Sequence, residues 1–412
     1  MSTHGFWFYF GYFIQLLFII LNFYYLTISL FAFIPRRYKT LTEVYEYDYA
    51  LIIAAHNEEK VISNLIESLN MQNYNKEKYK IFVIADNCSD RTAEIAHSAG
   101  ADVFERFDNQ NKGKGAAMEW MFQKIFDMKR HFDFIGIFDA DNLVDSNFLS
   151  EMNLKANLGN KVIQGYLETK NPHDSWITYS YAMGYWEVNK LFQESRDNLG
   201  LSCQLSGTGF IVSVDLIKKI GWGATCLTED MEYTAKLVSQ NLRVAFAKNA
   251  IVYDEKPVTF RQSWNQRIRW MQGHADVASR FVSLLVKKTF RDSCWKSLDC
   301  MLYLLQPLRI LSSVFIYFVL IANILCPESK LVIWSIIGEE FCSIIAAFQI
   351  LWLPFVLLIQ GKLENKTLKL FPAYILYCLS WIPISFIGII TKNEKEWNHT
   401  EHVCDINISD IN

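Results

Sequence analysis

One almost wholly apolar run over residues 6–34 most constrains what this chain can fold into. It is long enough for one membrane-spanning helix and too short for two. A cleaved signal peptide would have a shorter apolar run and a small-residue cleavage site. The basic stretch PRRYK follows instead, and an excess of lysine and arginine marks the cytoplasmic side of a membrane. We therefore expect a transmembrane helix within residues 1–40, with the next block of the chain in the cytoplasm.

Three further apolar segments lie near residues 302–325, 341–359 and 371–390. Residues 263–300, which precede them, are expected to form interfacial helices, and residues 301–391 a membrane-embedded bundle. One N-terminal span plus three C-terminal spans would leave the C-terminal tail on the outer side of the membrane. We therefore expect a multi-pass protein of the cell membrane.

The composition excludes some classes of function. Hydrophobic residues make up 51% of the 412 residues, which is too apolar for a disordered chain. The formal net charge of −3 is close to balance, so no electrostatic footprint for nucleic acid is expected. The nine cysteines lack the spacing of a zinc site, and we expect reduced thiols in a protein that faces the cytoplasm.

The block between the first two membrane regions, residues 41–262, has a different pattern. Short strand-like runs alternate with helical stretches. The expected strands are 50–55, 80–86 and 134–141, and the expected helices are 59–71, 92–99 and 115–131. Continuous apolar strands separated by helices predict an α/β domain with a parallel or mixed sheet covered on both faces. Ligands of such sheets bind beyond the carboxyl ends of the strands.

Asp139 and Asp141 follow an expected strand in the stretch FDADN. Side chains two apart on a strand point the same way, so the two carboxylates could converge on one divalent cation. Hard oxygen ligands suit Mg²⁺ or Mn²⁺, which in turn suit a diphosphate. The alternative is a solvated turn at the end of the strand, because this pair of aspartates is common by chance.

Two other strand-to-helix turns carry polar residues. Asn57 can cap the helix after the first strand, and Glu58 and Glu59 suit its first turn. Asp86 lies at the end of the next strand. These residues could face a nucleotide, with Asp86 accepting hydrogen bonds from a base or ribose. They could equally shape the two turns and do nothing else.

The stretch NKGKGAAM places Lys112 and Lys114 on either side of Gly113. The glycines permit close approach of the backbone, and the lysines could neutralise a phosphate. The spacing is not that of a Walker A loop, and the Ser or Thr that would follow is missing. By itself this stretch is a weak indication of a phosphate site.

The stretch CLTEDMEYTAKL places Thr228 at an expected helix N-cap, with Glu229 and Asp230 in the first turn. Acidic residues at this place are what helix capping favours, and capping is the alternative to a functional role. A carboxylate at the mouth of a site could also act as a general base, provided that it reaches an acceptor hydroxyl.

The stretch SWNQRIRWMQGH combines aromatic, basic and amide side chains close to the membrane segments. Gln266, Arg269 and Trp270 fall at positions i, i+3 and i+4, so they share one face of a helix, which Gly273 extends. Arg267 is expected to point toward lipid headgroups or solvent. An interfacial amphipathic helix is the alternative for the whole stretch, but it does not explain the shared Gln/Arg/Trp face.

The order of these motifs resembles that of the family 2 glycosyltransferases. The strand turn AAHNE, the strand-end aspartate, DAD, TED and QxxRW occur in this order and are followed by membrane segments. More narrowly, the chain looks like the membrane-embedded branch that contains cellulose, hyaluronan and poly-N-acetylglucosamine synthases. The resemblance covers about residues 50–273, and its specific part is the pairing of TED with QxxRW.

The resemblance implies a GT-A, Rossmann-like domain inserted between transmembrane helices, binding a UDP-sugar donor. Asp86 would contact the uracil, with Asn57 and Glu58 on the nucleotide side. Lys114 would lie near the nucleotide, and Asp139 beside the ribose and diphosphate. The donor is UDP-glucose or UDP-N-acetylglucosamine, which the motifs do not distinguish.

The resemblance also implies the catalytic groups and the metal. Asp230 would be the general base, and Asp141, with Asp139, would bind Mg²⁺ or Mn²⁺. The implied enzyme is a hexosyltransferase that inverts the anomeric carbon, giving a β-linked product from an α-linked donor. Stabilisation of the charge that develops on the leaving diphosphate is the main help such a transfer needs.

On the acceptor side, the resemblance implies that Thr228 and Glu229 shape the site and that Gln266, Arg269 and Trp270 line the end of a growing glycan chain. The stretch SGTGF lies where the family positions its acceptor. The expected activity is elongation of a polysaccharide and its export through the lipid bilayer. Transfer of one sugar to a lipid acceptor, giving a glycolipid, is the alternative.

The C-terminal tail, residues 392–412, contains EWNHTEH, which resembles a tail motif of related bacterial synthases. In those proteins the tail is cytoplasmic. This conflicts with the span count, and we weight the motif more heavily, which implies that one span is miscounted.

Overall fold

The computed structural model describes residues 3–38, 40–223, 225–325, 351–394, 402 and 404–411. Two of the helices in this part of the chain are long and apolar enough to cross a membrane. They are Tyr9–Phe33, near the N-terminus, and Asn365–Ile390. The first lies within α1 (Thr3–Leu30) and the short helix η1 (Phe31–Phe33), as the apolar run predicts.

The expected apolar segment 302–325 is not one straight helix. Helix α11 (Trp295–Leu304) and helix α12 (Gln306–Leu325) meet at Leu305 with a bend of 54°. The apolar segment expected near 302–325 therefore begins at the end of α11, before the bend, and α12 forms the rest of it. Pro307 has no amide hydrogen to continue the preceding helix, and it is tolerated in the first turn of the next one. Of the expected segment 341–359, residues 351–359 are helical and the rest lies outside the described residues.

The central domain is built on an eight-stranded mixed sheet in the order β3-β2-β1-β4-β7-β6-β8-β5. Strands β1, β2, β3 and β4 are parallel neighbours, β7 pairs antiparallel with β4 and β6, and β6 pairs parallel with β8. The strands are β1 (Tyr49–Ala55), β2 (Tyr79–Asp86), β3 (Asp102–Arg106), β4 (Phe134–Asp139), β5 (Leu143–Val144), β6 (Val162–Thr169), β7 (Phe210–Ser213) and β8 (Ala245–Asp254).

Helices cover both faces of this sheet, as the apolar strands predict. In β1, Leu51 and Ile53 belong to one core, and Ala50 and Ile52 belong to the other, because successive strand residues point to opposite faces. The helices on the first face are α2 (Ile62–Asn70), α3 (Thr92–Ser98) and α5 (Phe148–Asn157). Those on the second face are α4 (Lys114–Phe126), α8 (Val214–Ile220) and α9 (Glu229–Ser239).

Two expected helix boundaries are wrong. Helix α2 begins at Ile62, three residues later than expected, so Asn57 does not cap it and Glu58 and Glu59 precede its first turn. Asn57 instead has a φ of 56°, and its Oδ1 accepts a hydrogen bond of 2.8 Å from the Ser89 amide. Helix α4 ends at Phe126, five residues before the expected end.

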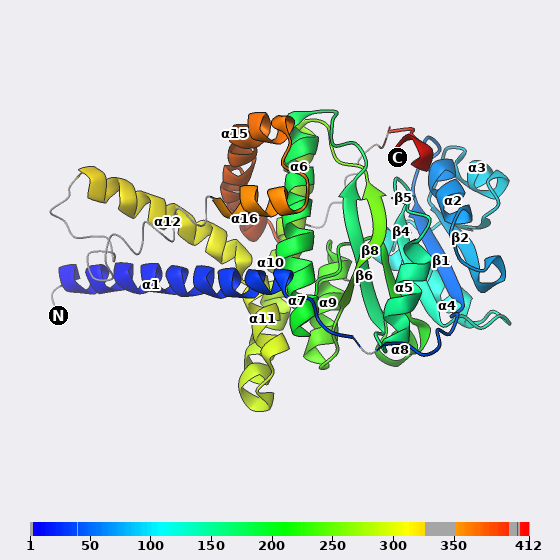
Figure 1. Cartoon of the computed structure of the whole chain (residues 1–412), viewed down its shortest axis with the longest axis horizontal. Coiled ribbons are helices and arrows are strands. Elements are labelled where there is room, and N and C mark those ends of the chain that lie inside the picture. Colours follow the sequence, from blue (N-terminus) through cyan, green and yellow to red (C-terminus); the bar gives the residue numbers. More distant parts are fainter. Residues whose placement is uncertain are drawn as a thin grey trace.

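Two long helical elements connect the sheet to the apolar helices (Figure 1). One consists of α6 (Trp176–Glu187), the π-helical segment η3 (Val188–Glu194) and α7 (Ser195–Leu199). The other is the 33-residue helix α10 (Phe260–Asp292). Helix α6 packs against β6 and α15 (Asn365–Leu379), whereas α10 packs against α9, α11 and α16 (Trp381–Ile390).

Buried polar contacts hold the domain and the apolar helices together. The guanidinium of Arg196 donates two hydrogen bonds, of 2.8 and 2.9 Å, to the carboxylate of Asp299, and both side chains are buried. The Tyr24 hydroxyl of α1 donates to the same carboxylate at 2.8 Å. At the other edge, Lys362 forms a 3.2 Å ion pair with Glu168 of β6. The domain therefore has a defined orientation relative to these helices.

The described part of the C-terminal tail lies on the central domain, close to α2 (Figure 1). Asp405 accepts a 2.7 Å hydrogen bond from Asn64, and the Cys404 amide donates to Glu255 at 3.2 Å. The tail is thus on the same side of the apolar helices as the central domain. This placement agrees with the expectation from the tail motif that the tail and the catalytic domain lie together. The number of membrane spans stays a prediction.

Candidate active site

The sequence-predicted site residues of the sheet meet at one edge. β1, β2 and β4 are adjacent and parallel, so the turn after β1, Asp86 at the end of β2 and Asp139 at the end of β4 lie at the same edge. This is the edge at which α/β sheets bind ligands. The turn after β1 includes Asn57 and Glu58.

Asp86 is buried and held by an arginine that sequence reasoning missed. Nη1 of Arg106 donates to Oδ1 of Asp86 at 2.6 Å, and Nδ2 of Asn87 donates to the same oxygen at 3.0 Å. Nη2 of Arg106 also donates to the carbonyl oxygen of Asn111 at 2.7 Å, in the loop that leads to Lys114. Arg106 is paired with Asp86 in the β2–β3 register, a contact that none of the sequence motifs indicates.

Glu58 belongs to the same edge through its contact with the tail. Nδ1 of His402 lies 3.0 Å from the Glu58 carboxylate, and Nε2 of His402 lies 3.8 Å from the carboxylate of Asp141. Burial lowers the pKa of His402, but Asp141 and Glu58 outweigh this and raise it to about 10. Asp141 and Glu58 therefore both favour the protonated form of the His402 imidazole.

Lys114 connects the strand end to the SGTGF stretch. Its ammonium group pairs with the Asp139 carboxylate and donates a 2.7 Å hydrogen bond to the Gly207 carbonyl. The Asp139 amide donates to Oγ1 of Thr208 at 2.9 Å. Burial disfavours the charge on Lys114, yet Asp139 and Glu229 hold its pKa above the usual value. Lys114 is consequently a fixed positive charge in the site.

Asp141 does not share a strand with Asp139, because β4 ends at Asp139. The expectation that both side chains point one way along a strand is therefore wrong. Asp141 is buried in the following turn and accepts a 3.2 Å hydrogen bond from the Glu255 amide. Burial raises its pKa to about 8, and the carboxylates of Asp254 and Asp139 act in the same direction. Among the described residues, no group of three or more His, Cys, Asp or Glu side chains forms a ready cation cage.

The TED stretch begins helix α9 as expected, with Thr228 as the N-cap residue. Thr228 makes no side-chain capping bond, and it packs against Gly273 of α10, where any Cβ would collide with it. Burial raises the pKa of Glu229, whereas Lys114 and Arg269 oppose the rise. The close approach of α9 and α10 thus brings the TED and QxxRW stretches together.

Asp230 lies in the same first turn, beside the SGTGF stretch. Its Oδ1 accepts a 2.7 Å hydrogen bond from the Met231 amide, and a Cβ on Gly207 would lie 3.7 Å from its Oδ2. Burial raises its pKa to about 7, and the neighbouring Glu229 contributes. A carboxyl group with such a pKa can take up a proton near neutral pH, as a general base requires.

Gln266, Arg269 and Trp270 share one face of α10, as their spacing predicts. The Tyr181 hydroxyl donates to Oε1 of Gln266 at 2.9 Å. The Trp270 ring stacks on Trp381 of α16, with 6.5 Å between ring centroids. Burial lowers the pKa of Arg269, whereas the negative charges of Glu229 and Asp139 raise it. The Arg269 guanidinium therefore interacts electrostatically with both carboxylates.

Arg267 is a correction to the sequence analysis. It is wholly buried, whereas headgroups or solvent were expected around it. Its Nη1 donates to Oγ of Ser380 at 2.7 Å, and its guanidinium lies 4.2 Å from the ring centroid of Tyr377 and 5.1 Å from that of Trp381. Helix α10 is covered by α15 and α16 on this side, so Arg267 holds three helices together.

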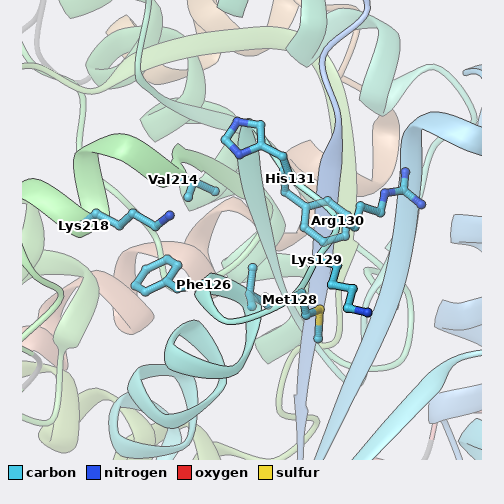
Figure 2. Close-up of a pocket in the computed structure, with 9 residues that line it drawn as sticks. Phe126, Met128, Lys129, Arg130, His131, Val214 and Lys218 are labelled. Carbon is cyan, nitrogen blue, oxygen red and sulfur yellow. The ribbon is translucent and has the colours of Figure 1, made fainter.

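A separate cavity of about 170 Å³ lies at the opposite edge of the sheet. Lys218 and Phe126 flank one side of it, and Lys129 and Arg130 the other (Figure 2). Lys218 lies in the last turn of α8, where a positive charge complements the helix dipole. The cavity includes none of the predicted site residues and is not part of the candidate active site.

This mixed sheet, with acidic strand ends facing the first turn of α9, is the GT-A fold of glycosyltransferases. Residues 47–273 match the family model "Glycosyltransferase like family 2", which covers more than half of the chain. The chain therefore belongs to glycosyltransferase family 2, and it is a hexosyltransferase. The predicted family, fold class and enzyme class are confirmed.

Curated relatives have different products. The chain is 26% identical over 251 residues to "Probable glycosyltransferase YdaM" of Bacillus subtilis, covering 58% of each protein. It is 25% identical over 283 residues to poly-β-1,6-N-acetyl-D-glucosamine synthase of Staphylococcus aureus, covering 66% of this chain and 63% of the relative. It is 24% identical over 237 residues to β-monoglucosyldiacylglycerol synthase of Synechocystis, covering 54% and 47%. The chain thus spans about three fifths or less of these relatives.

A solved structure supports the fold. The mannosyltransferase PcManGT of Pyrobaculum calidifontis, in complex with GDP-Man and Mn²⁺, matches with a TM-score of 0.58. The match covers 92% of this chain and 100% of that chain, at 13% sequence identity. That neighbour was solved with GDP-Man and Mn²⁺ bound, and at this level of identity the match supports the fold alone.

Proposed function

We propose that this chain is an inverting β-glycosyltransferase that uses UDP-glucose or UDP-N-acetylglucosamine to elongate a polysaccharide and export it across the membrane. One observation carries the proposal: on helix α10, Arg269 interacts with the carboxylates of Glu229 and Asp139, and the neighbouring Trp270 stacks on Trp381 of α16. The groups of a transfer site are thereby placed directly against the apolar helices. The relative that makes poly-N-acetylglucosamine supports the same product class.

The donor lies at the sheet edge in this proposal. Asp86 accepts a hydrogen bond from the uracil through the carboxylate that Arg106 orients. Lys114 neutralises phosphate, and Asn57 and Glu58 border the nucleotide. These assignments follow the resemblance of the motifs, and the convergence of the strand ends supports them.

The residues present fit a divalent cation. Asp141 is a buried carboxylate whose pKa burial raises, and Asp254 and Asp139 act in the same direction while His402 opposes them. A divalent cation beside it would add to the opposing effect of His402. Asp141 would hold Mg²⁺ or Mn²⁺ together with Asp139. When bound, the cation would supply charge stabilisation for the leaving diphosphate.

The chemistry assigned to the protein is a single displacement. Asp230 takes the proton from the acceptor hydroxyl, whose oxygen forms a bond to the anomeric carbon while the bond from that carbon to the UDP oxygen breaks. Arg269 and Lys114 stabilise the negative charge that the diphosphate gains. Attack from the face opposite the leaving group inverts the configuration and gives a β linkage.

The acceptor lies between α9 and α10. Thr228 and Glu229 shape its entrance, and Gln266, Arg269 and Trp270 line the end of the growing chain. In the corresponding division of the protein, 1–40 is a transmembrane helix, 41–262 the cytoplasmic catalytic domain, 263–300 the interfacial helices, 301–391 the membrane helices and 392–412 a cytoplasmic tail. Two helices with the length and composition of membrane spans support an embedded enzyme.

A second candidate is transfer of one sugar to a lipid. The relative named as a β-monoglucosyldiacylglycerol synthase favours it, because that name describes a glycolipid product. In this case Trp270 and the apolar helices would face the lipid acceptor, and no polymer would be exported.

The test is direct. Purified full-length protein is incubated with radiolabelled UDP-glucose or UDP-N-acetylglucosamine, with Mg²⁺, Mn²⁺ or a chelator. We expect one donor to give a long polymer in the presence of a metal. A single glycolipid would support the second candidate, and absence of label transfer from either donor would reject both.

A further inference from the structure

Tyr181 on α6 contacts two members of the QxxRW face at once. Its hydroxyl donates to Gln266, and its ring lies edge-on to Trp270, with 6.1 Å between centroids and 87° between ring planes. Tyr181 itself is 2% exposed. We propose that Tyr181 is a positioning residue, which orients Gln266 and Trp270 for the acceptor. This proposal rests on the proposed function, because it assigns the acceptor to that face.

The hydrogen bonds around Tyr181 have one direction. Oγ of Ser263 donates to the Tyr181 oxygen at 3.2 Å, and the Tyr181 hydroxyl donates to Oε1 of Gln266 at 2.9 Å. A tyrosine has one hydroxyl hydrogen, which is used on the amide oxygen. The Nε2 group of Gln266, with two donors, is then the end that remains for hydroxyl or ring oxygens of a sugar.

The ring contacts fix the second residue. Trp270 contacts the Tyr181 ring edge-on and stacks on Trp381, and the ring centroid of Tyr377 lies 5.4 Å from that of Tyr181. Packed aromatic pairs of this geometry add to the stability given by burial alone. An indole held in this way has one orientation to offer to an acceptor sugar.

The donor role of Tyr181 persists at neutral pH. Burial raises the pKa of its hydroxyl to about 12, and Ser263 and Arg267 act in the opposite direction. The hydroxyl therefore keeps its hydrogen under assay conditions. Helix α6 is itself anchored by a capping box at Ser175, so Tyr181 stands on a fixed element.

The chain offers a matched control two residues away. Tyr179 is on the same helix, is 1% exposed and forms a 2.7 Å hydrogen bond with Thr367, and none of its ring contacts is with the QxxRW face. The variants Tyr181→Phe and Tyr179→Phe each remove one buried hydroxyl together with its side-chain hydrogen bonds. A purely structural effect should be of similar size in both.

The experiment measures label transferred to product, free labelled sugar and UDP release from UDP-glucose and UDP-N-acetylglucosamine with Mn²⁺. Since Gln266 loses its partner, we expect Tyr181→Phe to lower transfer by about ten-fold. The KM for the donor should stay unchanged, and a larger share of the donor should be hydrolysed. Tyr179→Phe should stay within about two-fold of the wild type in transfer.

A double variant identifies the route of the effect. If Tyr181 acts through Gln266, Tyr181→Phe should lower transfer by less than about two-fold in a Gln266→Ala background. Three outcomes would each overturn the proposal. Tyr181→Phe could leave transfer unchanged, or Tyr179→Phe could lose as much transfer as Tyr181→Phe. The third is that the effects of Tyr181→Phe and Gln266→Ala multiply in the double variant. Failure of the proposed function is distinguishable, because the wild type would then transfer label from neither donor.

Discussion

Asp230 is the proposed general base, and its buried charge also disfavours the folded state. Replacing this carboxylate affects activity and stability in opposite directions. In the structure its pKa rises from 3.8 to about 7, first because of burial and second because of Glu229. Asp230→Asn keeps the shape of the side chain and removes the charge. We expect this variant to lose transfer activity and, at alkaline pH, to become more stable than the wild type.

The size of the stability effect follows from the pKa. A shift from 3.8 to about 7 corresponds to about 4 kcal/mol. Asp230 retains partial exposure, so water screens part of this and we expect about 1–2 kcal/mol. The sign follows from linkage: a raised pKa means that the folded state binds the proton more tightly. The wild type therefore loses stability as the pH rises from about 4 to about 7.

The assay is thermal unfolding of the detergent-solubilised protein at pH 5 and pH 8. Asp230→Asn should gain stability over the wild type at pH 8 and much less at pH 5. The matched variant Asp215→Asn removes an exposed carboxylate from the first turn of α8, so it should not raise stability at either pH.

Activity supplies the second half of the test. For the wild type, kcat/KM should rise with pH through about 7, because Asp230 must be deprotonated to act as a base. Asp230→Asn should lose turnover and retain UDP binding. Retained turnover would refute the assignment of the base, and a variant less stable than the wild type at pH 8 would refute the argument from burial.

Three further predictions follow from named contacts. Arg106→Met should raise the KM for the UDP-sugar by about ten-fold with a smaller effect on kcat, because Asp86 loses the hydrogen bond from the arginine and keeps the one from Asn87. An unchanged KM in UDP-release kinetics would contradict this. Arg267→Met should lower the free energy of unfolding by about 2–3 kcal/mol, through lost cation–π and charged hydrogen bonds, as thermal unfolding would show. Asp141→Asn should raise the Mn²⁺ concentration for half-maximal transfer at least about ten-fold. If the variant needs the same Mn²⁺ concentration as the wild type, Asp141 is not a metal ligand.

Features that depend on local periodicity could be predicted from the sequence. The apolar runs at 50–55 and 80–86 became neighbouring buried strands. Thr228 is an N-cap residue because its neighbours favour the first turn of a helix. Gln266 and Trp270 share a face because 3.6 residues per turn bring i and i+4 together, whatever the helix packs against.

Features that depend on contacts between distant segments could not. The Arg106–Asp86 pair joins residues 20 apart, and His402 meets Glu58 across 344 positions. Arg267 lies in a stretch whose composition suggests a membrane interface, yet the packing of α15 and α16 over α10 buries it.

The sequence alone determined the family, the α/β domain between apolar segments and the polar face of the helix at residues 263–274, because these follow from the order and spacing of neighbouring residues. Tertiary structure decided the direction in which that face points. Tyr181 on α6 and Trp381 on α16 contact the ring of Trp270, and Glu229 on α9 attracts Arg269. The reason is physical: helical periodicity sets which side chains lie together, but burial and charge pairing depend on which surfaces the fold brings into contact.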